Sequence, residues 1–370
     1  MYLLNNLRRV WRELRGEPLH VLPNKTWSIA KPKLSKFGEE VAHRTGIGRV
    51  LGQRYRGAGV ALMFHEIHDD VDAELRTGCD VAQLTRIIEA VLAEGREIVT
   101  IEEGLRRLAD PESRPFALLT FDDAYRDNWT NALPVLEHFN APLTLFAPTG
   151  MIDRSIYAWW LGLREVIKSF DNVEVPAMEK KFTTSDLASK AASMRQIAGW
   201  IGTSQSRADA LEDVFVQSGV SVSEIVERVA MNAQELKRFS EHRLVTIGAH
   251  TQTHRFLSNL DDESVVRELS VNKAFLEDLL QVPVKYLAYP YGTETACGAR
   301  EADIAENVGF TASFTTRPGH LFADHLNSPQ LLPRIDIGYA PQSAAALASR
   351  LNGLHRAMTT NFGEPMATLA

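Results

Sequence analysis

The chain has 370 residues, of which 45% are hydrophobic and 24% charged, and its formal net charge is −7. This composition is typical of a globular protein with one large domain or two, and the negative net charge argues against nucleic acid as a partner. Cys79 and Cys297 are too few for a disulfide framework and favour a reducing compartment. No stretch reaches the roughly 18 to 20 continuous apolar residues of a membrane-spanning helix.

Residues 1–58 are expected to form a helical extension. Within residues 1–16, apolar side chains lie near one helical face and four arginines lie largely off it. Such a segment either rests on an anionic membrane surface or packs on its own domain or a partner subunit. It lacks the apolar core and cleavage site of a secretory signal, so we expect a cytoplasmic protein and leave membrane association open. The residues concerned are Leu3, Leu4, Leu7, Trp11 and Leu14, with Arg8, Arg9, Arg12 and Arg15.

From residue 59 onward, short apolar runs alternate with segments of helical period. This alternation predicts a mostly parallel sheet that is closed or nearly closed as a (β/α) barrel. Thr100 and Glu103 resemble a capping box that opens one of the helices. The predicted strands are 60–67, 97–101, 116–121, 143–147, 244–249, 284–289 and 310–315, and the main predicted helices are 81–95, 129–138, 262–281 and 299–307.

Residues 153–243 interrupt the alternation. They are polar and helical in pattern and contain no strong strand, so we expect an insertion between barrel units. Trp159, Trp160 and Trp200 lie in this segment; aromatic side chains can bind sugars, but their helical spacing favours local core. The expected organisation is therefore an extension at 1–58, a barrel at 59–340 with the insertion inside it, and a C-terminal helix and tail at 341–370.

Polar residues follow three of the predicted strands at the point where each strand ends. Asp122 and Asp123 follow 116–121, His250 and His254 follow 244–249, and His65 lies at the end of the first strand. Taken alone, an Asp pair is most often a helix cap or a solvated turn, and two histidines at this spacing occur by chance. Ligands bind at the carboxyl ends of parallel strands, so the joint occurrence indicates one site. Two imidazoles and one carboxylate are a suitable ligand set for Zn²⁺ or a similar divalent ion.

These residues make the sequence resemble the polysaccharide deacetylase family, which shares the NodB-homology domain. The family motif T-F-D-D stands at 120–123, H-[ST]-x-x-H at 250–254, and P-Y-G at 290–292. Alone, P-Y-G would be read as a turn. The stretches "LMFHEI" and "LLPRID" also resemble the branch of the family associated with exopolysaccharide synthesis.

The resemblance implies a deformed (β/α) barrel of about seven parallel strands and metal-dependent hydrolysis of N-acetyl, sometimes O-acetyl, groups on sugars. It implies that Asp123, His250 and His254 ligate the ion, with Zn²⁺ expected before Co²⁺, Mn²⁺ or Ni²⁺. It also implies that Asp122 is the general base and that the backbone N–H of Tyr291 helps to hold the oxyanion.

The proton donor is where the sequence departs from the family pattern. The late L-x-x-H motif has no clear copy, and "LLPR" offers Arg334, which cannot donate a proton usefully at neutral pH. His65 is the first candidate for the general acid and His320 the second. Ala288 replaces the arginine that many members carry two residues before the motif proline, and Arg334 is a candidate to contact Asp122 instead.

Three functions are weighed from the sequence. The first is a deacetylase acting on an N-acetylated sugar of a polysaccharide or glycoconjugate pathway. The second is a deformylase or cyclic amide or imide hydrolase on the same barrel. The third is a non-catalytic carbohydrate-binding protein, suggested by the missing late histidine and opposed by the retained aspartates and histidines. A cytoplasmic chain would meet a lipid-linked or nucleotide-linked precursor or a short oligosaccharide. The exact sugar and the oligomeric state are not predicted.

Overall fold

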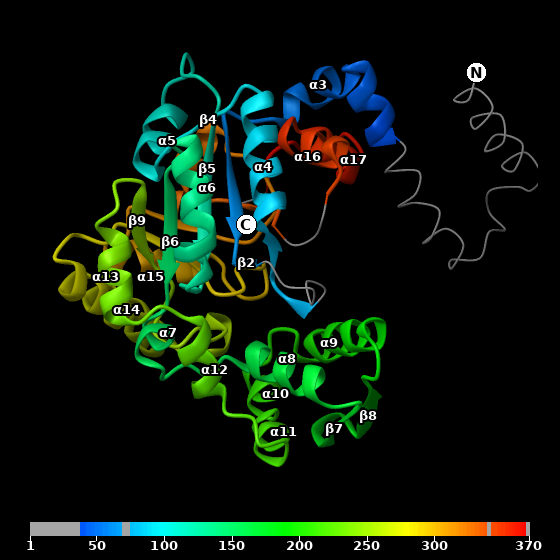
Figure 1. Cartoon of the computed structure of the whole chain (residues 1–370). Coiled ribbons are helices and arrows are strands. Elements are labelled where there is room, and N and C mark those ends of the chain that lie inside the picture. The colour runs from blue at the N-terminus through cyan, green and yellow to red at the C-terminus, as the bar shows by residue number, and fades with distance from the viewer. Residues whose placement is uncertain (1–37, 69–74, 339–341, 368–370) are drawn as a thin grey trace, which may run out of the picture.

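A curled sheet of seven parallel strands forms the centre of the molecule (Figure 1), with the order β11-β10-β9-β6-β5-β1-β12. The computed structural model describes residues 38–68, 75–338 and 342–367. A further short strand, β4, pairs with β5. The strands are β1 (Gly59–Phe64), β4 (Glu97–Ile98), β5 (Phe116–Asp122), β6 (Leu143–Ala147), β9 (Val245–Ala249), β10 (Tyr286–Ala288), β11 (Ala312–Phe314) and β12 (Ile335–Asp336).

Helices cover the outside of the sheet, which explains why every residue of β1, β5 and β6 is buried. Side-chain caps start two of these helices: Asp80 accepts the Gln83 N–H at 2.6 Å, and Thr100 accepts the Glu103 N–H at 3.3 Å. The helices are α4 (Val81–Ala93), α5 (Ile101–Leu108), α6 (Leu133–Phe139), α13 (Ala233–Ser240), α14 (Asp262–Leu280) and α15 (Ala299–Val308).

Residues 332–336 bring the two edges of the sheet together. The backbone of Leu332 donates to Ser313 at 2.9 Å and accepts from Thr315 at 2.8 Å, next to β11. Three residues later, β12 pairs with β1. The sheet is therefore a deformed (β/α) barrel, as the sequence predicted.

The insertion forms a layer beyond the carboxyl ends of the strands (Figure 1). It has its own hydrophobic core, which continues into barrel loops through Tyr125 and Phe256. The expectation that it lacks strands is wrong, because β7 and β8 form an antiparallel hairpin whose alternate side chains are buried. Its elements are α8 (Trp159–Ser169), β7 (Asn172–Val175), β8 (Lys180–Thr183), α9 (Leu187–Ile201), α10 (Gln205–Asp209), α11 (Glu212–Gln217) and α12 (Val222–Val229), and α7 (Thr149–Asp153) leads into it. Helix α13 falls within the predicted range 153–243 but packs against β9 and α14 of the barrel.

Three short helices lie at the opposite end of the barrel, near the start of β1 (Figure 1). They are α3 (Ile47–Gly52), α16 (Ala344–Leu351) and α17 (Leu354–Thr359), and α3 packs against α17. We call this end of the barrel the amino pole. The predicted amphipathic segment 1–16 lies outside the described residues.

The predicted strands are all present; 143–147 has the predicted bounds, 116–121 extends by one residue to Asp122, and most of the others are shorter at one or both ends. The sequence missed β12 and a small parallel pair, β2 (Glu66–His68) with β3 (Gly78–Asp80). Strands of two or three residues have too few positions to show a period, so the pattern could not indicate them.

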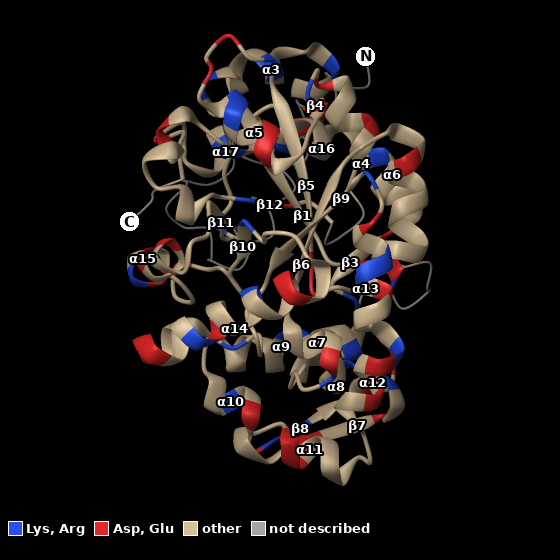
Figure 2. Cartoon of the chain, turned by 90° about the vertical axis from the view of Figure 1, so that its left-hand side faces the viewer, with Lys and Arg blue, Asp and Glu red and all other residues tan. Residues whose placement is uncertain are grey.

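Charged residues belong mainly to the helices and loops around the sheet, while the central strands contain few of them (Figure 2). Among the described helices, none combines the length and the apolar character that crossing a membrane requires.

Candidate active site

A pocket of about 490 Å³ opens at the carboxyl ends of the strands. Its walls include Asp122 and Asp123 from the end of β5, His250 and His254 from the loop after β9, and His65 from the end of β1. The structure thus brings together the polar residues that follow separate strands in the sequence.

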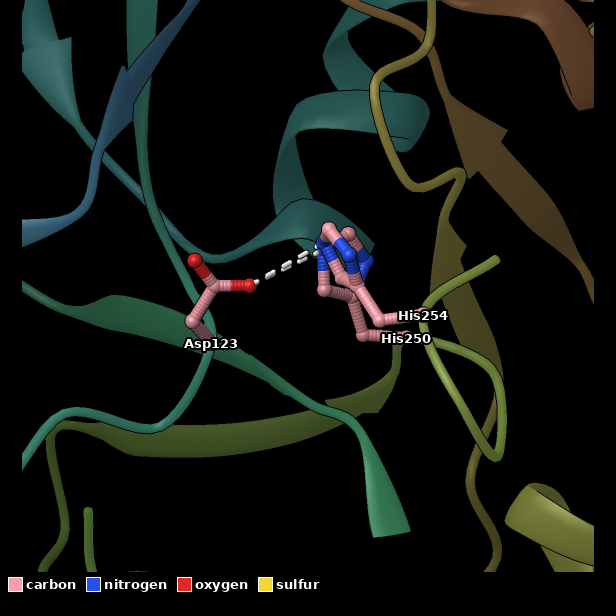
Figure 3. A group of neighbouring side chains, drawn as sticks. All are labelled: Asp123, His250 and His254. Atoms are coloured by element: carbon pink, nitrogen blue, oxygen red, sulfur yellow. Dashed lines mark ion pairs between the residues drawn. The ribbon is translucent and has the colours of Figure 1, made fainter. Parts of the chain in front are cut away.

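Asp123, His250 and His254 point toward one another at the base of this pocket (Figure 3). The Asp123 Oδ1 atom lies 3.5 Å from His250 Nε2 and 3.3 Å from His254 Nε2. All three side chains are buried, and their candidate ligand atoms lie within 4.8 Å of one another. They form the one such group of three or more potential ligands found in the part of the chain that the structure describes.

Buried polar atoms show that this trio suits a cation. No described residue hydrogen-bonds to Asp123 Oδ1, although that oxygen is shielded from solvent. Burial raises the pKa of Asp123, but the neighbouring histidines outweigh burial and hold it well below its usual range. His250 places Nδ1 2.6 Å from the Ala288 carbonyl oxygen, so this nitrogen carries the proton and Nε2 offers a lone pair to the site. Two imidazoles and one carboxylate fit Zn²⁺ or a similar divalent ion.

Helix α14 fixes the loop that carries both histidines. Glu268 accepts hydrogen bonds from the backbone N–H groups of Gln252 at 2.9 Å and Thr253 at 2.8 Å. Asn272 accepts from the His250 N–H at 2.8 Å. Neither residue was predicted from the sequence; the available signal was two polar side chains, four residues apart, on the otherwise apolar inner face of this helix.

The site loops adopt left-handed backbone conformations that side chains other than glycine rarely take. Such conformations persist only where surrounding contacts hold them, and they cluster at functional sites. Here they turn the chain abruptly at the strand ends and aim the ligands inward. The residues are Asp123 (φ 74°), Ala124 (φ 55°), Thr251 (φ 64°), His254 (φ 57°) and Tyr291 (φ 61°).

Asp122 is held by a fully buried arginine. Arg334 donates from Nη1 to Asp122 Oδ1 at 2.7 Å and from Nη2 to Oδ2 at 2.8 Å. Its Nε–H donates to the Thr315 carbonyl oxygen at 3.0 Å. Burial raises the pKa of Asp122, but the charge and hydrogen bonds of Arg334, together with His250 and His65, outweigh burial and the net shift is downward. The carboxylate is therefore ionised and fixed in orientation.

The structure separates the two candidate proton donors. His65 lines the pocket, and its Nε2 lies 4.0 Å from Asp122 Oδ2. His320 is buried beside a different cavity, of about 260 Å³, which it shares with Arg350. His320 thus does not face this pocket.

Two tryptophans of α8 form a wall of the pocket and also belong to the core of the insertion. Trp159 Nε1 donates to the Tyr291 hydroxyl at 2.9 Å. The Trp160 ring lies 4.7 Å from the His254 ring, between centroids. Trp159 and Trp160 therefore pack in a local core and also line the pocket, although the sequence left a core role and a sugar-binding role as alternatives. Trp200 packs with Arg207 instead.

A third carboxylate lines the pocket, and no role was predicted for it from the sequence. Asp336 of β12 stands opposite Met63 of β1 and lines the pocket with it. Burial raises its pKa. The one available signal was its position in "LLPRID", two residues after Arg334.

Comparisons with solved structures find the same fold. PplD from Streptococcus pyogenes, a deacetylase in complex with acetate, aligns with a TM-score of 0.52 and 17% identity over 79% of this chain and 97% of its own. A de-N-acetylase from Aggregatibacter actinomycetemcomitans gives 0.50 and 12% over 78% and 97%. BC0361, a polysaccharide deacetylase from Bacillus cereus, gives 0.50 and 15% over 79% and 68%.

No curated protein matches the sequence. The family model described as polysaccharide deacetylase matches residues 109–198 and 205–313, more than half of the chain. The matched residues include the aspartates after β5 and the histidines after β9. The chain belongs to the polysaccharide deacetylase family.

Proposed function

We propose that the protein is a metal-dependent hydrolase that removes N-acetyl groups from a sugar in a polysaccharide or glycoconjugate pathway. The observation that carries this proposal is the pairing, in one pocket, of a buried Asp–His–His group with a second carboxylate held ionised by Arg334. A binding protein would not need a fixed, ionised carboxylate beside a set of metal ligands.

Asp123, His250 and His254 would hold the ion, which would act as a Lewis acid and lower the pKa of water from about 15.7 towards about 7. Asp122 takes the proton of the attacking water, since Arg334 keeps its carboxylate ionised and fixed.

The backbone N–H of Tyr291 helps to hold the oxyanion that develops from the amide oxygen. Tyr291 lines the pocket, and no described residue accepts a hydrogen bond from its N–H. The hydrogen bond from Trp159 fixes the Tyr291 side chain and with it this turn of the backbone. A fixed donor stabilises the developing charge without reorganisation during the reaction.

His65 donates the proton that the leaving amine needs. Its Nε2 atom lies 4.0 Å from Asp122 Oδ2, so the two side chains lie on the same wall of the pocket. The His65 ring is partly exposed to the pocket. An amide needs this proton because an amine anion is a poor leaving group, whereas an aryl ester does not.

Acetate release from an N-acetylated chitooligosaccharide tests the reaction. We expect acetate before chelation and none afterwards, and Asp122→Asn should lower kcat by about 10²- to 10⁴-fold while metal content stays unchanged. Full activity in Asp122→Asn would contradict the assignment of the base. Release of formate, or a ring-opened product from a cyclic amide, would favour the alternative hydrolase.

A leaving-group comparison tests His65. His65→Asn should lose amide hydrolysis and keep most of its hydrolysis of an aryl acetate ester. The exposed His138, changed to Asn, is the matched control and should alter neither activity. Equal loss on both substrates would assign His65 a structural role.

We also propose that the protein is cytoplasmic and contacts the membrane peripherally through residues 1–16, with a lipid-linked glycan as substrate. The support is the basic amphipathic pattern of that segment. Full-length protein should sediment with anionic vesicles, and a variant carrying Arg8→Glu and Arg12→Glu should sediment less. Equal sedimentation of the two would remove this proposal.

A further inference from the structure

Helix α3 presents its apolar side chains to solvent and its glycines to the protein. Gly48 and Gly52 are buried against the segment at the start of α17, where a Cβ at Gly52 would come within 2.3 Å of a backbone oxygen. A helix packed only on its own domain normally turns its apolar stripe inward. The outward stripe has the i, i+3, i+4 spacing of one helix face and consists of Ile47, Val50 and Leu51, which are 49%, 71% and 43% exposed.

Two more exposed apolar side chains lie next to this stripe. Arg49 of α3 donates to the Ala93 carbonyl oxygen at 3.1 Å, beside Leu92, which is 46% exposed. Tyr55, just after α3, donates to the Gly363 carbonyl oxygen at 3.0 Å, beside the 53% exposed Phe362. We call Ile47, Val50, Leu51, Leu92 and Phe362 the amino-pole patch; it holds five of the eleven large hydrophobic residues exposed in the described part of the chain.

The charge of the surrounding chain identifies what covers the patch. Residues 1–58 contain twelve Lys and Arg and four Asp and Glu, a net charge of +8, in a protein of net charge −7. Residues 1–37, outside the description, lead directly into the helical residues 38–45 that precede α3. Two copies meeting at this patch would bring two such cationic segments together, which electrostatic repulsion disfavours. An anionic lipid surface complements both the charge and the apolar side chains.

We propose that the amino-pole patch rests on an anionic phospholipid surface and fixes the barrel with its active site facing away from the membrane. This inference rests on the membrane contact proposed above for residues 1–16 and adds a second, folded contact. The pocket lies at the carboxyl ends of the strands, whereas the patch lies beside their amino ends.

This orientation limits the substrate. Strand β5 has seven residues, so it separates the two poles by about 23 Å at about 3.3 Å per residue. A sugar attached directly to a membrane lipid cannot span that distance. The substrate class is therefore an N-acetylated glycan whose reacting sugar stands several residues from its lipid anchor.

Vesicle sedimentation of the full chain tests the patch. The double variant Val50→Glu and Leu51→Glu should bind vesicles containing phosphatidylglycerol at least tenfold more weakly than the parent. Its rate of acetate release from a soluble chitooligosaccharide should stay unchanged. Val216→Glu is the matched control, because Val216 is 69% exposed but lies on the insertion. If the double variant binds vesicles as tightly as the parent, the proposed membrane contact through the patch is wrong, and the contact through residues 1–16 is unaffected. If the parent does not bind vesicles, both proposed contacts are wrong.

An environment-sensitive fluorophore tests the orientation. Cys79 and Cys297 are buried, so labelling can be directed to Leu92→Cys or to Val216→Cys. Emission should shift to the blue on vesicle addition for the Leu92→Cys label and stay constant for the Val216→Cys label. A shift at Val216→Cys, or at neither position while vesicles are bound, would contradict the orientation. If sedimentation equilibrium shows a dimer that the Val50→Glu and Leu51→Glu variant dissociates without change in vesicle binding, the patch serves a second copy instead.

Discussion

Asp122 and Asp123 are neighbours in the chain and both are buried, yet they meet different partners. Asp122 binds Arg334 through both carboxylate oxygens, whereas Asp123 faces two imidazoles. The positive φ at Asp123 turns the second carboxylate away from the first. This separation suits the two roles proposed above, in which Asp122 acts as a base and Asp123 as a metal ligand.

Replacing Arg334, the positively charged partner of Asp122, should destabilise the fold. We expect Arg334→Met to lower the free energy of unfolding by about 3 to 5 kcal/mol, because a buried carboxylate is left without its partner. Asp122→Asn added to Arg334→Met should recover part of that loss, since no charge then remains buried. Urea unfolding of the two single variants and the double variant measures this coupling. Strictly additive losses would show that the two side chains do not depend on each other.

The chemistry-bearing residues were predictable because family motifs are local in sequence. Asp122 with Asp123, and His250 with His254, occupy short windows and follow recognisable strands. The contact between Arg334 and Asp122 was also predicted, because Ala288 stands where many family members carry an arginine, although the two residues lie 212 positions apart. Glu268 and Asn272 act through backbone N–H groups of another segment, and no local pattern encodes such contacts.

At the scale of elements, α8 joins the insertion to the barrel at a buried ion pair. Arg164 donates to Glu66 Oε2 at 2.6 Å, and Arg76 donates to Glu66 Oε1 at 2.9 Å. Glu66 belongs to β2, so one carboxylate links α8, β2 and the segment before β3. The same helix carries Trp159 and Trp160 into the pocket, so this link positions a wall of the active site.

Stability should depend on pH through Glu66. Burial raises its pKa, but Arg164, Arg76 and the Thr77 N–H together outweigh burial and hold the folded-state pKa below the ordinary value of 4.5. The stabilisation is therefore present above pH 4.5 and is lost as the pH falls through the folded-state pKa. Glu66→Gln should cost about 3 to 5 kcal/mol at pH 7, and its difference from the parent should shrink under acid conditions.

Denaturant unfolding across this pH range checks the prediction. The exposed pair Arg267–Glu263 supplies the control, and Glu263→Gln should cost no more than about 0.5 kcal/mol. A Glu66→Gln penalty that stays constant down to pH 3 would show that its carboxylate charge is not what stabilises the fold.

The insertion shows why some helices could be predicted from the sequence and why its two short strands could not. Its two longest helices, α8 with 11 residues and α9 with 15, are long enough to display a 3.6-residue period, and helical structure was expected there. The hairpin β7–β8 turns at Glu179, which takes φ of 50° although it is not a glycine or asparagine. Pro176 is the one usual turn residue in "PAMEK", and no Gly or Asn occupies the left-handed position that follows it. The signal in the sequence was therefore too weak to separate the hairpin from its helical surroundings.

At the scale of the whole molecule, the ion ligands join two segments that are distant in sequence. Asp123 follows β5, and both histidines follow β9. An unfolded chain does not hold these groups together, so a bound ion stabilises the folded state alone. Zinc at 100 times its dissociation constant should contribute about 2.7 kcal/mol.

Thermal unfolding with and without zinc measures this linkage. Tm should rise with zinc in the parent and stay constant in Asp123→Ala, whereas Asp324→Ala, at an exposed position, should behave as the parent. An equal rise in all three proteins would place the ion elsewhere.

The barrel class was predictable from the alternation of strands and helices. The amino-pole patch was not, because the exposure of its side chains depends on which faces of the helices pack together.

Strand β12 is the last strand of the barrel in chain order, and it follows Arg334 directly. Apart from Asp336, every other residue of the pocket therefore leaves the ribosome before the guanidinium group that holds Asp122. A nascent chain that has emerged only to residue 331 has an open sheet edge, and Asp122 at its mouth lacks its arginine partner. Folding of this protein is completed late in translation, and hydrolysis has to wait for the same event.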